Sequence, residues 1–170
     1  MDESQKKLLE ALRRAVQAEV EGWGFYGMAA LTTTDPQGKK VFEALAAEEM
    51  SHASYLKAQY RAILETGAVD AKATLGKPKE MAGGSPIFSD SLKKRIGDAH
   101  FEMSALGIAV QLEHDSMVFY REQAKAAADP AVRAFFGDLA AWEQGHHEAL
   151  SRQQEALKED YWQQNGFAPF

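Results

Sequence analysis

A long segment of the sequence occurs twice, with an offset of 94 residues. Residues 15–56 align with residues 109–150 without a gap, and 16 of the 42 aligned positions are identical. The best-matched part reads LAAEEMSHASYL in the first copy and LAAWEQGHHEAL in the second. A period this long with only two copies cannot build a solenoid, so the repeat predicts a duplicated helix pair that packs against itself.

Each copy contains a Glu-X-X-His motif on one predicted helix and a further glutamate on the helix before it. The six residues are Glu19, Glu49 and His52 in the first copy, and Glu113, Glu143 and His146 in the second. Glu and His at positions i and i+3 lie about 60° apart around a helix and about 4.5 Å along it, so both can reach one site. A single such motif is more often a solvated pair. Two of them, with two more helix carboxylates, form the ligand set of di-iron and di-manganese bundles.

The ligand set predicts a dinuclear metal centre. Four carboxylates in an apolar core would repel one another and lose their hydration, and two divalent cations remove that conflict. We expect Glu49 and Glu143 to bridge both ions, with one imidazole on each ion. Glu19 and Glu113 are the expected terminal ligands. Oxygen ligands with two imidazoles suit two iron ions or manganese, and zinc can occupy the same atoms. The repeat also predicts that the two metal environments are nearly alike.

Two tyrosines are the candidate catalytic residues. Tyr26 and Tyr120 each follow a terminal ligand by seven residues, which returns them to the same helix face, about 10 Å further along. They can donate a hydrogen bond to a ligating carboxylate of the opposite copy. The alternative, that they are core aromatics with a satisfied hydroxyl, stays open on the sequence alone.

Other polar residues near the motifs are predicted to have no role in the centre. Three acidic residues lie off the ligand face and are expected to be solvated: Glu21, Glu48 and Asp115. Three histidines have no equivalent in the other copy and are expected to be on the surface or internally satisfied: His100, His114 and His147.

Apolar residues at helical spacing predict four long helices. Their expected extents are about 4–32 and 36–65 in the first copy, and about 98 onward and 130–157 in the second. The fold class is therefore all-α, a four-helix bundle made of two duplicated hairpins.

Helix starts can be predicted from capping residues. Asp35 and Asp129 each precede a proline and read as an N-cap followed by a first-turn proline. Ser89 or Asp90 is expected to cap a short helical lead-in, LKKRI, and Asp98 to open the third long helix.

A long crossover loop is predicted from Gly67 to about Phe88, where Gly, Pro, Lys and Ala predominate. About twenty extended residues reach beyond 60 Å, and a thirty-residue helix is about 45 Å long, so the loop can carry the chain along the whole bundle. We expect one bundle domain over residues 1–160. The aromatic C-terminal tail, residues 161–170, is expected to cover an apolar groove of this subunit or of a partner. The alternative, that the tail is a functional docking peptide, stays open on the sequence alone.

Composition excludes several classes of function. The net charge of −6 and the pI near 5.4 argue against nucleic-acid binding. The absence of cysteine excludes disulfides, thiolate-bound metals and iron–sulfur or rubredoxin-type centres in this chain. The charged amino terminus lacks a signal-type apolar region, and no run of 18 apolar residues predicts a membrane span. We expect a cytoplasmic protein.

The combined motifs AEVEGWGFY, EEMSH, LEHDSMVFY and WEQGH resemble those of the rubrerythrin-like branch of the ferritin-like superfamily. The resemblance covers about residues 8–158. It implies a ferritin-like, left-handed four-helix bundle with one long crossover and a di-iron centre. It also implies a homodimer and chemistry with peroxide or oxygen.

The chain departs from the rubrerythrin pattern in two ways. Rubrerythrins carry a cysteine-ligated rubredoxin domain that feeds electrons to the di-iron site; with no cysteine here, we expect an external electron donor. They also tend to carry an extra carboxylate three residues after the first ligand of the third helix. This chain has Ser116 there, which argues against efficient peroxidase turnover.

Three hypotheses follow. The leading one is a di-iron oxidoreductase of peroxidase or ferroxidase type, which reduces peroxide or oxygen or oxidises ferrous iron. The alternative is an iron-binding or iron-handling protein without significant redox turnover. The third, a structural bundle with a vestigial site, is disfavoured by the intact ligand set.

Overall fold

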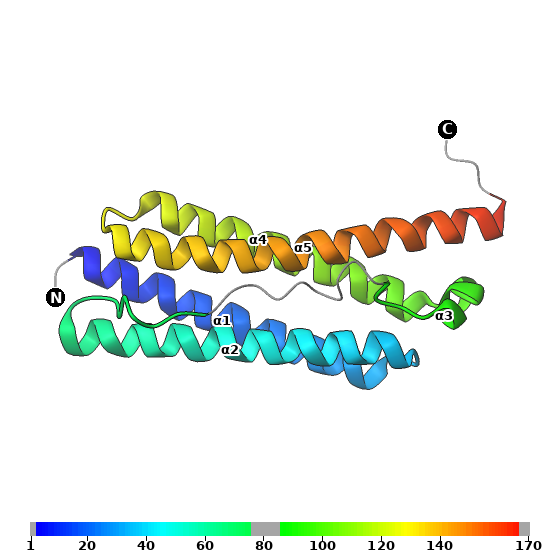
Figure 1. Cartoon of the computed structure of the whole chain (residues 1–170), viewed down its shortest axis with the longest axis horizontal. Helices are drawn as coiled ribbons and strands as arrows, with labels where there is room; N and C mark the ends of the chain where they lie inside the picture. Colours follow the sequence, from blue (N-terminus) through cyan, green and yellow to red (C-terminus); the bar gives the residue numbers. More distant parts are fainter. Residues whose placement is uncertain (1–2, 76–85, 167–170) are drawn as a thin grey trace.

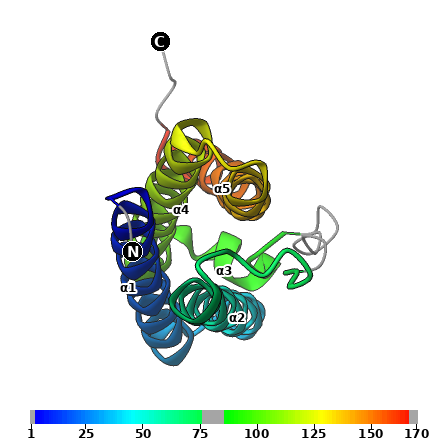
Figure 2. The same ribbon diagram turned by 90° about the vertical axis from the view of Figure 1, so that its left-hand side faces the viewer.

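The computed structural model describes residues 3–75 and 86–166, and these contain helices and no strands. The helices in chain order are α1 (Glu3–Thr32), α2 (Pro36–Thr66), α3 (Asp90–Lys94), the 3₁₀ turn η2 (Ile96–Asp98), α4 (His100–Ala126) and α5 (Pro130–Asn165). Figure 1 shows α1 lying along α2 and α4 along α5, and the end-on view in Figure 2 places the four long helices around a common axis. The predicted all-α bundle of two hairpins is confirmed.

The equivalent starts of α2 and α5 follow the predicted capping. The Asp35 carboxylate accepts a hydrogen bond from the backbone N–H of Gly38 at 2.8 Å, and Asp129 accepts one from Ala131 at 2.8 Å. Each cap satisfies a backbone donor that the first turn of a helix leaves unpaired.

The predicted start of the third long helix was wrong. Asp98 lies within η2, and α4 begins at His100 with Ala99 in the cap position and no side-chain cap. The backbone N–H of Ala99 bonds to the carbonyl of Ile96 at 3.1 Å, so the tight turn takes up the residues that were expected to open the helix. The short lead-in is present as α3, and Ser89 is its cap.

The described ends of the crossover are bound to α2 and α5. Gly67 adopts φ 79° and closes α2, a left-handed conformation that favours glycine. The Gln59 side chain on α2 bonds to both the N–H and the C=O of Asp70, and Gln153 on α5 accepts a hydrogen bond from the N–H of Ile87. The rest of the predicted loop, residues 76–85, lies outside the described residues.

The return of the chain after the crossover depends on a close contact. Phe88 is buried against Gly38 in the first turn of α2, and a Cβ at Gly38 would lie 2.4 Å from the Phe88 ring. The hydroxyl and N–H of Ser89 both donate to the Asp35 carboxylate, so one residue caps α2 and also holds the start of the second half.

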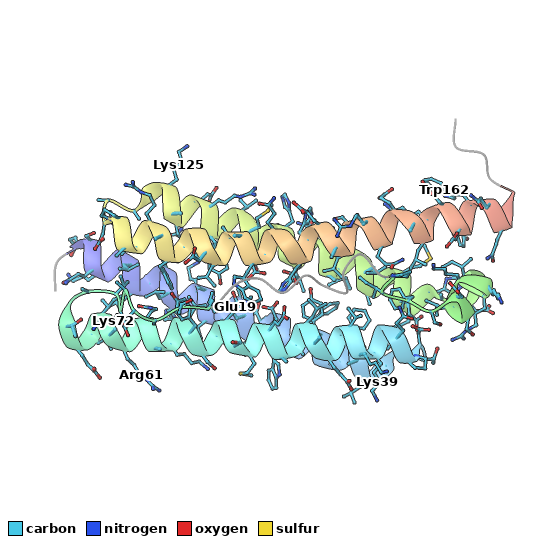
Figure 3. The ribbon with its side chains drawn as sticks, viewed as in Figure 1. Glu19, Lys39, Arg61, Lys72, Lys125 and Trp162 are labelled. Carbon is cyan, nitrogen blue, oxygen red and sulfur yellow. The ribbon has the colours of Figure 1, made fainter. Side chains whose placement is uncertain are left out.

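The first half of the predicted aromatic tail is helical. Helix α5 runs to Asn165 and is closed by Gly166 at φ 68°. Trp162 points away from the bundle in Figure 3 and is 37% exposed. Residues 167–170 lie outside the described residues, and the groove-covering role of the tail stays a prediction.

Two apolar clusters occupy the interior on either side of a polar centre. The first is built around Tyr26, Phe42, Leu45, Phe88, Leu106 and Leu150. The second is built around Leu12, Leu56, Ile63, Tyr120, Phe136 and Leu139. The copies match in detail, because Tyr26 stacks on Phe42 as Tyr120 stacks on Phe136. No helix in the described part of the chain is both long and apolar enough to span a membrane.

Candidate metal centre

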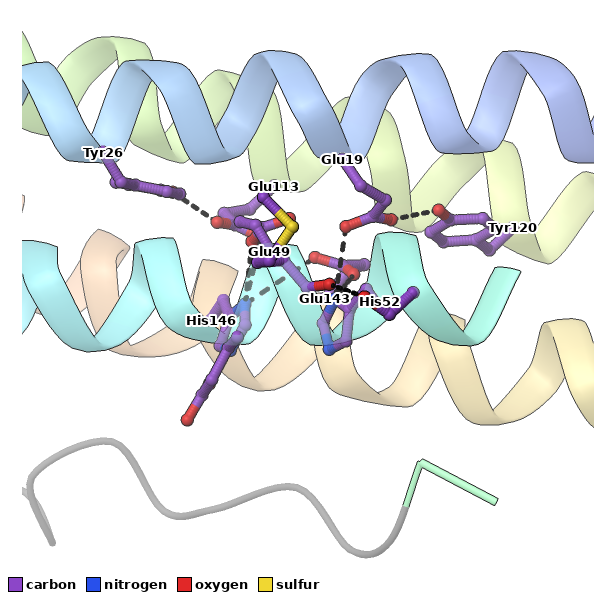
Figure 4. A network of polar contacts seen from close by, with 11 residues as sticks. Glu19, Tyr26, Glu49, His52, Glu113, Tyr120, Glu143 and His146 are labelled. Atoms are coloured by element: carbon purple, nitrogen blue, oxygen red, sulfur yellow. Dashed lines mark hydrogen bonds and ion pairs between the residues drawn. The ribbon is translucent and has the colours of Figure 1, made fainter. Parts of the chain in front are cut away.

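All six predicted ligands lie inside the bundle, and each long helix contributes. Helices α1 and α4 provide one glutamate each, and α2 and α5 provide one Glu-X-X-His motif each (Figure 4). None of the six side chains belongs to a residue more than 5% exposed. In Figure 3, Glu19 points into the bundle, whereas Lys39, Arg61 and Lys125 point outward.

The six side chains form two overlapping groups. One group is Glu19, Glu49, His52 and Glu143; the other is Glu49, Glu113, Glu143 and His146. Within each group, one ligand atom per residue lies within 4.8 Å of all the others. Glu49 and Glu143 belong to both groups, which is the geometry that bridging carboxylates require.

Both histidines turn the same ring nitrogen toward the carboxylates. Nδ1 of His52 lies 3.2 Å from Oε2 of Glu19 and 3.1 Å from Oε1 of Glu143. Nδ1 of His146 lies 3.3 Å from Oε2 of Glu113 and 3.8 Å from Oε1 of Glu49, the repeat equivalents of Glu19 and Glu143. The inner arrangement therefore follows the two-fold repeat.

Several of these converging atoms have no hydrogen bond. Oε1 of Glu49, Oε1 of Glu143 and Nδ1 of His146 are buried and make none, although neighbours lie within ion-pair distance. Buried polar atoms without partners are costly, and a cation among them would satisfy all three. The donor set of four carboxylates and two imidazoles fits two divalent cations and suits iron or manganese.

Burial of like charges raises the pKa values of the two shared carboxyls. Desolvation is the largest cause for both. Repulsion from Glu143 adds to it at Glu49, whose pKa lies well above its ordinary value. Repulsion from Glu19 and Glu113 adds to it at Glu143, whose pKa rises to about 7. Without cations, the centre therefore retains protons that a solvated glutamate would release.

The other four groups respond to opposite charge. Burial opposes ionisation of His52, but the carboxylates of Glu143 and Glu19 outweigh it and raise the pKa to about 9. The pKa of His146 is raised well above its ordinary value in the same way, chiefly by Glu113 acting against burial. The pKa values of Glu19 and Glu113 are lowered, because hydrogen bonds and the imidazoles outweigh desolvation.

Each candidate tyrosine bonds across the bundle to a terminal carboxylate. The Tyr26 hydroxyl donates to Oε1 of Glu113, and the Tyr120 hydroxyl donates to Oε1 of Glu19 (Figure 4). Burial raises both tyrosine pKa values, with the bound carboxylates adding to the effect, so the hydroxyls stay protonated. The hydrogen bond foreseen from the sequence is present, and the catalytic role of the tyrosines stays a prediction.

The rubrerythrin family model matches the chain over residues 10–152, and a further match covers residues 104–165. The chain belongs to the rubrerythrin family. That family binds di-iron centres, and the buried carboxylate and histidine cluster described above lies within the matched residues. No curated protein sequence and no solved structure matches the chain.

A pocket of about 310 Å³ leads to the centre of this rubrerythrin-family bundle between α1 and α4. Glu49, Glu113, Ser116 and both tyrosines are among the residues that line it. Gly22 keeps the passage open beside the centre, because a Cβ there would lie 3.3 Å from Oε2 of Glu49. The outer rim carries charges of both signs: Arg14, Glu21 and Asp115.

The prediction that Glu48 is solvated was wrong. Its side chain is only 15% exposed, and its Oε2 lies 2.7 Å from Nε2 of His146. Glu48 lies one residue before a ligand on α2 and reaches across to α5, which helical spacing within one hairpin cannot show. Its repeat equivalent is Trp142, which contacts His52. The two halves of the candidate centre therefore have the same candidate ligands but differ in the residue that reaches each histidine from the other hairpin.

The remaining predicted residues lie where the sequence placed them. Glu21, Asp115, His100 and His114 are exposed, and His147 is half-buried beside His114. Glu102 on α4 was not predicted. It is buried and accepts hydrogen bonds from the Thr33 hydroxyl and the Thr34 N–H. The repeat could not reveal it, because the equivalent position in the first copy is Leu8.

Proposed function

We propose that this chain holds two iron ions and acts as an oxidoreductase that reduces peroxide or oxygen with electrons from an external donor. The observation that carries the proposal is the pair of overlapping ligand groups that share Glu49 and Glu143. Two shared carboxylates hold two cations close together, as a two-electron reaction at one place requires. Manganese or zinc can occupy the same atoms.

Bound as ferrous ions, the metals supply the two electrons that, with two protons, reduce one hydrogen peroxide to two waters. The protein fixes the geometry in which this happens. Tyr26 and Tyr120 hold the terminal carboxylates from the opposite hairpin, and each keeps a proton beside the pocket that reaches the centre. The flanking apolar clusters exclude bulk water, which strengthens electrostatic interactions inside.

The proposal includes partners. An external donor returns two electrons after each turnover, since this chain contains no cysteine to ligate a rubredoxin-type centre. We also propose a homodimer, and exposed apolar side chains on α1 and α4, including Trp23, Leu31 and Ile108, are consistent with a subunit contact. The cytoplasmic location predicted from the sequence stays a prediction.

The test is a single-turnover experiment. Metal-free protein is loaded with two equivalents of Fe(II) under nitrogen and mixed with one equivalent of peroxide or with oxygen. The expected result is oxidation of both irons by one peroxide, followed by recovery of Fe(II) on adding a reductant. No oxidation by either oxidant would overturn the proposal.

The same measurement separates the enzyme from an iron-handling protein. An oxidoreductase binds two irons per chain and turns over with a reductant, whereas a storage function takes up more than two irons per chain. The matched control is Glu143→Gln, which removes one shared ligand at nearly constant volume and should abolish oxidation at the paired site.

A further inference from the structure

The two histidines of the centre differ in what lies behind them. Nε2 of His146, the ring nitrogen that faces away from the ligand cluster, lies 2.7 Å from the Glu48 carboxylate. Nε2 of His52 is buried and has no hydrogen-bond partner among the described residues. The ring of Trp142 instead packs edge-on against His52, with centroids 5.2 Å apart.

The difference arises at equivalent positions of the repeat. Glu48 and Trp142 each stand one residue before a shared ligand, at the 94-residue offset. Each reaches from its own helix to the histidine of the other hairpin, Glu48 from α2 to α5 and Trp142 from α5 to α2. One copy therefore offers a carboxylate where the other offers an indole, which has no acceptor lone pair.

A carboxylate behind a histidine changes how that histidine binds a cation. It accepts the Nε2 proton, which fixes the tautomer with a free lone pair on Nδ1, holds the ring in place and makes it a stronger donor. His146 has this support and His52 does not. Glu48 also adds one more negative charge near one end of the centre.

We propose that Glu48 is a positioning residue that makes the two metal positions unequal, so that the position held by Glu113 and His146 binds its cation first and more tightly. The inference rests on the dinuclear site of the proposed function. It does not depend on turnover, because the ranking concerns binding alone and applies to any divalent cation that these ligands accept.

The experiment is an anaerobic titration of metal-free protein with Co(II), followed by calorimetry and by visible absorption. The parent should bind two Co(II) ions in two steps whose dissociation constants differ by about 10- to 100-fold, the usual effect of such an outer partner. Glu48→Gln keeps the side-chain size, removes the charge and should weaken only the tighter step by a similar factor. His146→Gln should abolish the tighter step, and His52→Gln the weaker one.

Trp142→Phe is the matched control. Trp142 packs edge-on against both His52 and His146, and phenylalanine keeps an aromatic ring beside them without changing Glu48, so the tighter step should stay unchanged. Glu48→Ala provides a second variant if Glu48→Gln does not fold, which a thermal melt of each protein establishes. Two equal steps in the parent, an equal weakening of both steps by Glu48→Gln, or loss of the weaker step in His146→Gln would overturn the inference alone. Failure of the parent to bind any Co(II) would overturn the proposed function with it.

Discussion

Replacing Glu143 with glutamine should stabilise the metal-free protein and remove its response to metal. The carboxyl is fully buried, and its pKa rises from 4.5 to about 7. Each tenfold change in that equilibrium corresponds to about 1.4 kcal/mol, so holding Glu143 ionised inside the fold costs about 3 kcal/mol. The amide removes this cost and can donate to the carboxylates that remain.

The net gain is smaller than that cost, because the variant also loses the partner that raises the pKa of His52. We expect a net stabilisation of about 1–2 kcal/mol, which corresponds to about 2–8 °C in melting temperature for a chain of this size. With added metal, the parent should become more stable than the variant. The parent gains about 2.7 kcal/mol per site at a free metal concentration of 100 times the dissociation constant, and the variant lacks a shared ligand.

The assay is thermal unfolding followed by circular dichroism at pH 8, first with a chelator and then with excess Mn(II). Glu159→Gln is the matched control, because Glu159 is an exposed glutamate on the same helix, and it should change stability by less than about 0.5 kcal/mol. The reasoning is refuted if Glu143→Gln melts below the parent in the presence of chelator, or if metal stabilises both proteins equally.

Three further predictions follow from the same structure. The melting temperature of metal-free protein should fall between pH 5 and 9: Glu143 loses its stabilising proton as pH rises from 4.5 to about 7, and His52 loses its own between 6.5 and about 9. Glu19 and Glu113, whose pKa values are lowered, change the stability only below pH 4.5. A melting temperature that rises between pH 5 and 9 would contradict the assignment. Tyr120→Phe should lower stability by about 1–3 kcal/mol in denaturant unfolding, because it leaves a buried carboxylate without its donor, while equilibrium dialysis still finds two metal ions per chain; unchanged stability would argue against the bond. Gly38→Ala should destabilise by about 1–3 kcal/mol, because its Cβ would overlap the Phe88 ring, and a thermal melt matching the parent would show that the contact is loose.

The long helices could be predicted because their signals are local. Periodic apolar residues and the Asp-Pro pairs gave the starts of α2 and α5 correctly. The start of α4 could not be predicted in the same way. Asp98 is a good capping residue, but tertiary packing buries Ile96 before it and Ala99 after it, and the chain closes a tight turn there instead. Propensity describes a residue alone, whereas burial of its neighbours decides which turn forms.

The convergence of the six candidate ligands could be predicted because the repeat supplied a second, independent copy of each motif. The contacts between the two copies could not be predicted, because helical periodicity shows which side chains point inward but not which residues they contact. The repeat also held a signal that was overlooked. Gln59 and Gln153 stand at the same offset of 94 residues just outside the aligned segment, and both bind the backbone of the crossover.

The two copies have the same residue at the positions whose charge the centre needs, and they differ at positions beside it whose charge it does not need. A bound cation needs carboxylates to balance its charge. Glu49 and Glu143 belong to both ligand groups, so replacing either of them would leave part of the cation charge unbalanced in both groups. The Glu48 carboxylate lies against His146, and the Trp142 ring packs closer to His52 than to His146, with centroids 5.2 Å and 6.2 Å apart. A substitution at position 48 is therefore expected to act mainly on the metal position of His146. A duplicated bundle can therefore keep the same ligands in both copies and still bind its two cations with different affinities. One difference between the copies is enough: a carboxylate at position 48 and an indole at the equivalent position 142, each in contact with a histidine.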